Sequence, residues 1–575
     1  MWAQTQVGDD LTGATADDRF GAAIDASDDA ATVAVGSPVS GLASVYDFDE
    51  TTMDYERRSV LSGPGGSEFG ASVAVTADGA SVVVGAPSGN VGGGVAAGYV
   101  ELFSLGQTGP GTTGYVSQGV IEGVEAAENA GTAVAIAVDN ATGATFFALG
   151  APLNSAGGTG AGAVRVYQRL SGSSTLQQLG NDITGGGAAF AAGSSVALSG
   201  EGDRVVVGSP GANGRDGRVE VYDYNAGTMT WQLVGSPIPG PARSSFGASV
   251  ATSEDGSRIA VGAPFFNNMA ATAAGLVRVY ELTNGQWQQV GNDIFGEVAD
   301  ELSGVSVSLS NDGMALAVGA PGNDEVGTDA GQARLYTMSG SSWTAVGTDV
   351  NGDAANDELG EAVVLSGDRQ RLLVGAPGAA ADAGLVRTFD TPAALPVTLT
   401  IFTAATVGKV VSLNWATAQE SGNDFFAIEH STDASTWAQL GRVTGAGDAL
   451  QTNNYDFIHD APATGQNYYR LRQVDYDGSF SFSPIRSVQF DGTAVSNVLL
   501  FPNPSKDGRV TVKLPDLSTD AAATLRVYSA GGRLVAEQTG ARASGEVTFN
   551  NLPRGTYYLD VSAAKEHYRR RFVVQ

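Results

Sequence analysis

Pairs of carboxylates stand in the loops that join one repeated segment of this chain to the next. Two of these loops read GNDIFGEVADELSG and GTDVNGDAANDELG, and they contain Asp300 with Glu301 and Asp357 with Glu358. Neighbouring carboxylates can hold a cation, accept hydrogen bonds from a ligand, or serve as the acid and base of a glycoside hydrolase. We therefore take these four acids as candidate ligand-binding residues.

A second candidate site lies in the stretch GAPFFNN, where Phe265 and Phe266 precede Asn267 and Asn268. Exposed aromatic side chains are common anchors of binding surfaces, and amides add directional hydrogen bonds. The alternative is that both rings are buried beneath their own loop. We include all four residues in the candidate ligand site.

Composition excludes several kinds of chemistry. The chain has no cysteine, and its three histidines, His430, His459 and His567, all lie beyond residue 400. Cysteine nucleophiles, Ser-His-Asp triads and histidine-bound metal centres are therefore excluded from the first 391 residues.

Charge is distributed unevenly along the chain. Residues 1–391 carry 44 acids against 15 arginines and no lysine, whereas residues 392–575 carry 17 acids against 16 basic residues. Nucleic acid would repel a segment with so many acids, and we therefore expect no nucleic-acid partner.

No apolar run is long enough to predict a transmembrane helix.

The elements that must position these candidates belong to an internal repeat. A Gly-Ala-Pro or Gly-Ser-Pro motif occurs seven times, with its prolines at positions 38, 87, 152, 210, 264, 321 and 377, and a glycine precedes most of these prolines by 17 residues. Each repeat contains four short runs of strand-like alternation bounded by turn residues. We predict an all-β fold that begins with a seven-bladed β-propeller over residues 1–391.

The first residues complete this predicted ring. WAQTQVGDD at the start matches WQQVGNDIF from Trp287 and WTAVGTDVN from Trp343, whereas the seventh repeat lacks such a segment. We therefore expect residues 2–6 to supply the outer strand of the seventh blade.

These repeats resemble the phenylalanyl-glycyl, glycyl-alanyl-prolyl (FG-GAP) repeats of the integrin alpha-chain propeller and its bacterial relatives. The resemblance implies that the acidic loops and GAPFFNN share the face that binds ligands in that family.

The resemblance also implies calcium loops of the form D-x-D-x-D-G, but the corresponding turns here, such as SEDGS and SNDGM, are too short to bind calcium in this way. VDNATGAT, with Asp139, Asn140 and Thr142, is a weak metal candidate, and a plain surface insertion is the alternative. Calcium is possible, and we predict no cofactor.

Two smaller β-sandwiches are expected to follow a linker at residues 392–396. Residues 397–492 are similar to the fibronectin type III-like modules of Bacteroidota proteins, with Trp415 as the core tryptophan. STDASTW, at residues 431–437, is similar to a sialidase Asp-box but lacks its glycine, and we interpret it as a β-turn.

Residues 493–575 resemble the type A C-terminal sorting domain of the type IX secretion system. Three ordered blocks carry the resemblance, with matching positions at Pro502, Asn503, Pro504, Gly508, Gly532, Leu552, Pro553, Gly555, Thr556 and Tyr557. The resemblance implies export through the type IX machinery, removal of the domain by its sortase, and release or attachment at the outer-membrane surface. Such cargo carries a signal peptide, which this sequence lacks.

Together these features predict a secreted or surface-displayed adhesion protein that presents propeller loops to an extracellular protein or glycan and is not an enzyme. The main alternative is a secreted polysaccharide-degrading enzyme that uses paired carboxylates on the same face. A structural surface-layer component is a third possibility.

Overall fold

Short alternating apolar segments separated by Gly, Asn and Asp produce an almost entirely β structure. The computed structural model describes residues 4–90, 97–109, 112–268, 271–339, 341–391, 399–407, 410–417, 420–432, 434, 436–449, 453–475, 480–490, 498–503, 505–506, 508–514, 523–530, 533–541, 545–563 and 566–574. The chain divides into two units, Met1–Ala393 and Ala394–Gln575. The only helices in these described ranges are the single turns α1 (Ala212–Arg215) and α2 (Ala379–Asp382).

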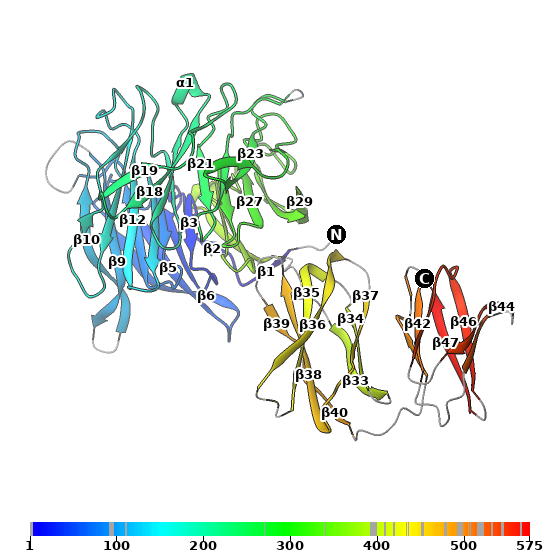
Figure 1. The fold of residues 1–575 in the computed structure, drawn as a ribbon. Helices are drawn as coiled ribbons and strands as arrows, with labels where there is room; N and C mark the ends of the chain where they lie inside the picture. The colour runs from blue at the N-terminus through cyan, green and yellow to red at the C-terminus, as the bar shows by residue number, and fades with distance from the viewer. Residues whose placement is uncertain are drawn as a thin grey trace. The chain divides into compact units, whose positions relative to one another are not determined.

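Seven antiparallel sheets follow one another along the described part of the first unit (Figure 1). The first three contain β3 (Ala23–Ala26), β4 (Thr32–Ser37), β5 (Leu42–Asp49) and β6 (Asp54–Ser62); β7 (Ser72–Val75), β8 (Ser81–Ala86), β9 (Tyr99–Gly109) and β10 (Thr112–Glu122); and β11 (Ala133–Asp139), β12 (Ala144–Ala151), β13 (Ala163–Arg169), β14 (Gln177–Gln178) and β15 (Ile183–Thr184).

The fourth to sixth sheets have the same order. They contain β16 (Ser195–Leu198), β17 (Arg204–Ser209), β18 (Arg218–Asn225), β19 (Thr230–Leu233) and β20 (Ile238–Pro239); β21 (Ser249–Thr252), β22 (Arg258–Gly262), β23 (Leu276–Thr283), β24 (Gln286–Gln289) and β25 (Ile294–Phe295); and β26 (Ser306–Leu309), β27 (Ala315–Ala320), β28 (Gln332–Ser339) and β29 (Ser342–Asn351).

The seventh sheet combines the two ends of the first unit. It contains β30 (Ala362–Leu365), β31 (Arg371–Ala376) and β32 (Leu385–Asp390), and β32 also pairs with β1 (Thr5–Gln6) and β2 (Leu11–Thr12). Thr5 lies opposite Asp390 and Gln6 opposite Phe389.

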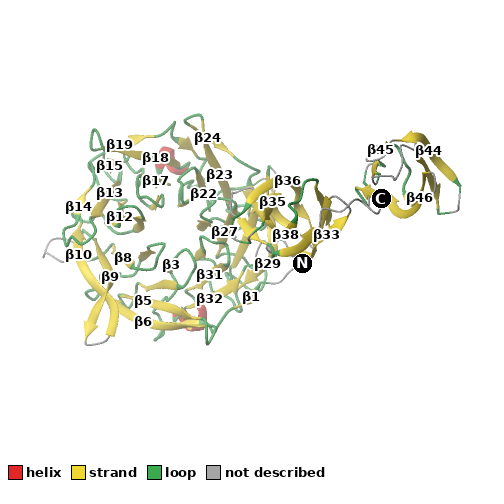
Figure 2. Cartoon of the chain, turned by 60° about the horizontal axis from the view of Figure 1, so that its bottom comes forward, coloured by secondary structure: helices red, strands yellow, loops and turns green. Residues whose placement is uncertain are grey.

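The first strands of consecutive sheets lie next to one another, and β3 also contacts β30. Figure 2 shows the sheets grouped around a common centre. This is a propeller-like arrangement, and the first strands of all seven sheets line a central cavity of about 450 Å³.

Glycine pairs explain why the repeat motif recurs. The glycine of each Gly-Ala-Pro or Gly-Ser-Pro motif packs against the carbonyl of a glycine in the next sheet; a Cβ on Gly319 would lie 1.9 Å from the carbonyl oxygen of Gly360. The same contact joins Gly375 of the seventh sheet to Gly21 of the first, at 2.1 Å. Gly360 itself has a φ of +95°, which L-residues rarely adopt. Only glycine allows such close backbone approach, so the packing of neighbouring sheets requires a glycine in every copy of the motif.

The second unit begins with two sheets that enclose an apolar core. One contains β33 (Leu399–Val407), β34 (Val410–Thr417) and β37 (Asn453–His459), and the other β35 (Glu420–Ser431), β36 (Ala438–Ala449), β38 (Gly465–Asp475), β39 (Phe480–Phe482) and β40 (Arg486–Phe490). Trp415 is buried and packs edge-on against Phe426 and face-on against Tyr455. The expected core tryptophan therefore occupies the core.

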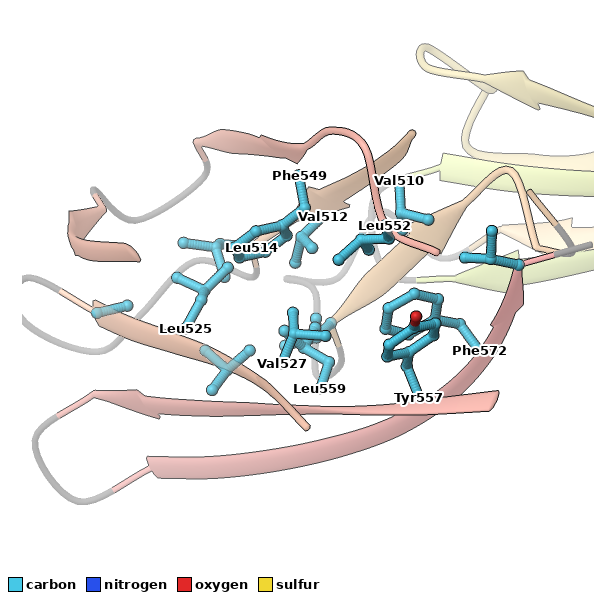
Figure 3. Packing of buried hydrophobic residues seen from close by; sticks show 14 of the residues in the cluster. Val510, Val512, Leu514, Leu525, Val527, Phe549, Leu552, Tyr557, Leu559 and Phe572 are labelled. Atoms are coloured by element: carbon cyan, nitrogen blue, oxygen red, sulfur yellow. The ribbon is translucent and has the colours of Figure 1, made fainter. Parts of the chain in front are cut away.

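Two further sheets form the C-terminal part of this unit. They contain β41 (Leu499–Phe501), β42 (Val510–Lys513) and β45 (Glu546–Phe549), and β43 (Ala523–Ser529), β44 (Leu534–Ala541), β46 (Gly555–Ala563) and β47 (Glu566–Val574). Val510, Leu525, Leu559 and Phe572 meet in their shared core (Figure 3).

Candidate functional site

Two series of loops meet at one end of the first unit, which we call the loop face. One series follows the second strand of each sheet and the other leads into the first strand of the next sheet. Backbone hydrogen bonds hold neighbouring loops together: the Asp300 amide donates to Thr272, and the Leu302 amide donates to Ala273. Because the strand pairing fixes where these loops begin and end, all candidate ligand residues of the first unit lie on this face.

The aromatic pair is split between surface and interior. Phe265 is 50% exposed, whereas Phe266 is partly buried against the core of its sheet. The Phe266 ring stacks on Phe295, with ring centroids 5.8 Å apart, and Phe295 is itself 44% exposed. Val298, in the next loop, is also exposed. The sequence did not indicate Phe295 as a candidate, because the direction of its side chain depends on how the short strand β25 pairs with its neighbour.

The two amides hold the shape of their loop. The Asn267 side-chain oxygen accepts a hydrogen bond from the Ala273 amide, and that of Asn268 accepts one from Ala271. The Asn268 side-chain NH₂ donates to the Gly296 carbonyl at 3.1 Å. These amides therefore brace the aromatic residues.

Glu301 and Asp357 lie inside the loop face. Glu301 is fully buried, accepts hydrogen bonds from the amides of Glu297 and Val298, and forms an ion pair with Arg334 at 2.7 Å. Asp357 accepts hydrogen bonds from the amides of Asp353 and Ala354. Each carboxylate satisfies backbone donors that would otherwise be unpaired. Their geometry gives them a structural task in the loop.

Asp300 and Glu358 occupy the surface instead. Both have left-handed backbone conformations, with φ of 58° and 55°. The Asp300 side chain is exposed, and Glu358 pairs with Arg19 at 2.7 Å. Asp300 is thus the candidate acid that is most accessible to a ligand.

The same structural role recurs at Glu128, which sequence analysis did not single out. Arg165 is buried and binds both carboxylate oxygens of Glu128 at 2.9 Å, and its Nε donates to Asp182 at 2.8 Å. Burial alone would raise the pKa of Glu128, but hydrogen bonds from Arg165 and Asn154 lower it. The sequence carries a signal for this role, because Glu128, Glu301 and Asp357 each stand three residues before a repeat glycine.

The weak metal candidate forms a closed turn. Asp139 accepts hydrogen bonds from the amides of Ala141 and Thr142 and from the Thr142 hydroxyl. These bonds, led by that of the Thr142 side chain, lower the pKa of Asp139. Asn140 is exposed in the same turn. In the described ranges, no three Asp, Glu or His side chains gather closely enough to hold a metal ion.

Carboxylates also line the central cavity. Asp25 projects from the first strand of the first sheet and accepts a hydrogen bond from the Val75 amide at 2.7 Å. Burial raises the pKa of Asp25 to about 7 despite this bond. Burial also raises the pKa of Glu361 and Glu254, which border the same cavity. The sequence did not indicate these cavity acids, because most of the corresponding positions in the other repeats are Ala, Ser or Val.

The sorting-motif residues gather around one end of the C-terminal core. Leu552 is buried, and its amide donates to the Gly508 carbonyl at 2.9 Å. The Tyr557 hydroxyl donates to Pro553, and its ring stacks on Phe572 (Figure 3).

The remaining positions of that motif are distributed around this core. Asn503 accepts a hydrogen bond from the Val573 amide at 2.9 Å. Pro502 follows β41, and Gly555 and Thr556 begin β46. Pro504 and Gly532 lie outside the described residues.

Residues 499–575 match the secretion system C-terminal sorting domain family. The match confirms the predicted type IX sorting domain at the C-terminus and supports secretion by that system. No curated protein matches the chain in sequence. In the described ranges, no helix is long and apolar enough to cross a membrane.

Several solved structures are similar to this chain at low identity. Hydrazine synthase from Kuenenia stuttgartiensis is 13% identical over 64% of this chain and 94% of its own, with a TM-score of 0.41. Sqt1 from Saccharomyces cerevisiae is 15% identical over 85% and 100%, with a TM-score of 0.40. The β-propeller domain of Cps50 (Swd1) from Myceliophteria thermophila is 12% identical over 67% and 100%, with a TM-score of 0.42. With TM-scores below 0.5, none of them bears on the function of this chain.

Proposed function

We propose that this protein is a non-catalytic adhesion protein that acts outside the cell or on its surface after type IX export. Its first unit presents the loop face to an extracellular protein or glycan. The sorting-domain match supports the destination. The observation that carries the binding role is the exposure of two aromatic side chains on the loop face, Phe265 and Phe295, with Phe266 stacked on Phe295.

The proposal includes a finer fold assignment for each unit. The first unit is a seven-bladed FG-GAP propeller that β1 completes, which is supported by the pairing of β1 with β32 and by the contact between Gly375 and Gly21. Residues 397–492 form a fibronectin type III-like module between this propeller and the sorting domain. After export, the sortase removes that domain, and the remainder is released or attached to the surface.

Exposed aromatic residues held by braced loops have the properties of binding anchors. They lose little conformational freedom when a ligand covers them, because their backbone and part of their apolar surface are already fixed. Phe265 and Phe295 offer apolar area, and Asp300, in the loop that follows β25, offers an acceptor on the same face. A large exposed apolar side chain that is braced in this way favours a role in contact with a partner.

The test is binding of the full chain to arrays of glycans and extracellular matrix proteins, with calcium and with a chelator. We expect saturable binding that the Phe265→Ser, Phe295→Ser double variant weakens at least tenfold. Leu105→Ser is the matched control, since Leu105 is exposed on the β9–β10 hairpin at the opposite end of the strands. Unchanged binding by the double variant would overturn the loop-face assignment.

The same arrays should be analysed for cleaved products. The rival function, polysaccharide hydrolysis by paired carboxylates, requires turnover that Asp300→Asn or Glu358→Gln abolishes. Product release with those properties would replace adhesion by catalysis.

A further inference from the structure

Cationic and aromatic side chains share the outer face of the sheet that contains β35, β36, β38 and β39. On β38, Tyr469 and Leu471 point into the core, so Arg470 and Arg472 project from the opposite face. Glu429 of β35 lies opposite Arg470 across the strand pair, and Phe482 of β39 lies opposite Arg472. We call this surface the arginine face.

Aromatic rings hold the central guanidinium in place. The Arg470 guanidinium carbon lies 4.2 Å from the centre of the Trp437 ring and 3.9 Å from that of Phe482. The Glu429 carboxylate accepts a hydrogen bond from Arg470 Nε at 2.7 Å. The two rings and the carboxylate thereby engage this guanidinium, and the two Nη nitrogens are the donors that remain for a ligand.

A second stacked arginine extends the face. Arg442 of β36 is exposed, and its guanidinium carbon lies 4.2 Å from the centre of the Phe425 ring. No described carboxylate forms an ion pair with Arg442. The strand registers place Arg442, Arg470 and Arg472 on this face together with Glu429, while Asp424 lies at a register shift of β35. Arg486 of β40 lies opposite Tyr469, and its Nε donates to the Phe402 carbonyl, so it belongs to the core side of the sheet.

Charge and shape together define the partner. Arginines that are stacked on aromatic rings lose little entropy when they bind an anion, since their orientation is already fixed. Phe482 remains 46% exposed beside them and offers an apolar platform for the ring of a sugar. A sheet face that carries several guanidinium groups suits an extended chain with repeated anionic groups.

We propose that the arginine face binds an acidic polysaccharide, a glycan chain that bears carboxylate or sulfate groups. This site is separate from the loop face and does not depend on the function proposed for it. The excess of acids in the first unit repels polyanions, so binding is confined to the arginine face and weakens as salt rises.

The test is binding of the full chain to three immobilised glycans at low and moderate salt. Dextran sulfate and polygalacturonate supply sulfate and carboxylate groups, and unmodified dextran is the neutral match for the first. We expect salt-sensitive binding to at least one anionic glycan and none to dextran. Binding to neither anionic glycan at low salt would overturn the proposal, as would equal binding to dextran.

Two variants locate the site. Arg442→Gln and Phe482→Ser both alter exposed side chains, and together they should weaken binding at least tenfold while the thermal unfolding temperature stays nearly unchanged. The matched control is Arg569→Gln with Arg571→Gln, which removes exposed arginines from β47 of the sorting domain. Loss of binding in the control, with binding retained in the double variant, would overturn the assignment.

Poly-glutamate separates a glycan from an acidic protein partner. We expect it to compete weakly, because it lacks sugar rings to cover Phe482. If poly-glutamate binds more tightly than both anionic glycans and Phe482→Ser leaves its binding unchanged, the polysaccharide assignment is wrong.

Discussion

Arginine has different partners in the two units of this protein. In the first unit, Arg165 and Arg334 are buried and pair with the buried carboxylates of Glu128 and Glu301. On the arginine face of the second unit, Arg442 stacks on Phe425, and Arg470 and Arg472 share the single carboxylate of Glu429. A guanidinium that has its own buried carboxylate is neutralised by the fold, whereas Arg442 has no ion pair with a described carboxylate and keeps its positive charge available. The same residue type therefore stabilises loops in one unit and creates a candidate anion site in the other.

The largest expected effect tests the buried pairs. Arg334→Met leaves Glu301 buried without its cation, so we expect a loss of about 3–5 kcal/mol in the free energy of unfolding. Urea unfolding, with hydrogen exchange of residues 296–303 to locate the change, measures it. Arg442→Met is the matched control in the second unit and should cost only about 0.5–1 kcal/mol. Equal losses would remove the distinction between the two kinds of arginine.

The next effect tests how the repeats pack. A methyl group on Gly319 would meet the Gly360 carbonyl of the next sheet at 1.9 Å, so Gly319→Ala should destabilise the first unit by about 1–3 kcal/mol. Gly65→Ala is the control, because nothing lies within 4 Å of its added carbon. Thermal unfolding compares the two. A Gly319→Ala protein as stable as the control would contradict the role of the glycine pairs.

The two units should respond to pH in opposite directions, and Asp25 determines the response in the first. Its pKa rises from 3.8 in the unfolded chain to about 7 in the fold because of burial. Between these values the unfolded chain releases the proton first, so stability falls as pH rises, by up to about 1.4 kcal/mol per unit. Asp25→Asn should flatten this decline in urea unfolding measured from pH 4 to 7.5. A decline of unchanged slope would show that other groups cause it.

His459 should give the reverse dependence in the second unit. Burial, with a further contribution from the neighbouring His430, lowers its pKa to about 4, while Asp460 acts in the opposite direction. The unfolded chain therefore binds a proton first as pH falls from 6.5 towards 4, and stability falls with it.

His459→Gln should reduce this loss, measured by hydrogen exchange of residues 453–475 at pH 7 and pH 4.5. His567→Gln is the control because His567 is 71% exposed. A control that behaves like the His459 variant would contradict the assignment.

The local sequence was sufficient to predict structure where a residue acts within its own repeat or motif. The seven glycine motifs predicted repeated four-stranded units, and the blocks around Asn503, Leu552 and Tyr557 predicted the sorting domain that the family match confirms. Candidate ligand residues were harder to predict. Asp300 and Glu301 are adjacent in sequence, yet one is exposed and the other is fully buried. The buried acids Glu301 and Asp357 each stand three residues before a repeat glycine, where backbone amides of the same loop donate to the carboxylate. For Glu301, the cation comes from Arg334, which follows in a later strand.

Periodicity, composition and ordered motifs are properties of the chain, so they were enough to predict the all-β repeats, the acidic first unit and the C-terminal sorting domain. Only the folded structure shows that Glu301 pairs with Arg334, that Asp25 lines the central cavity, and that Trp437, Arg470 and Phe482 stack together. The physical reason is that burial and cation–π geometry depend on which strands pair, and strand pairing joins residues that are distant in sequence.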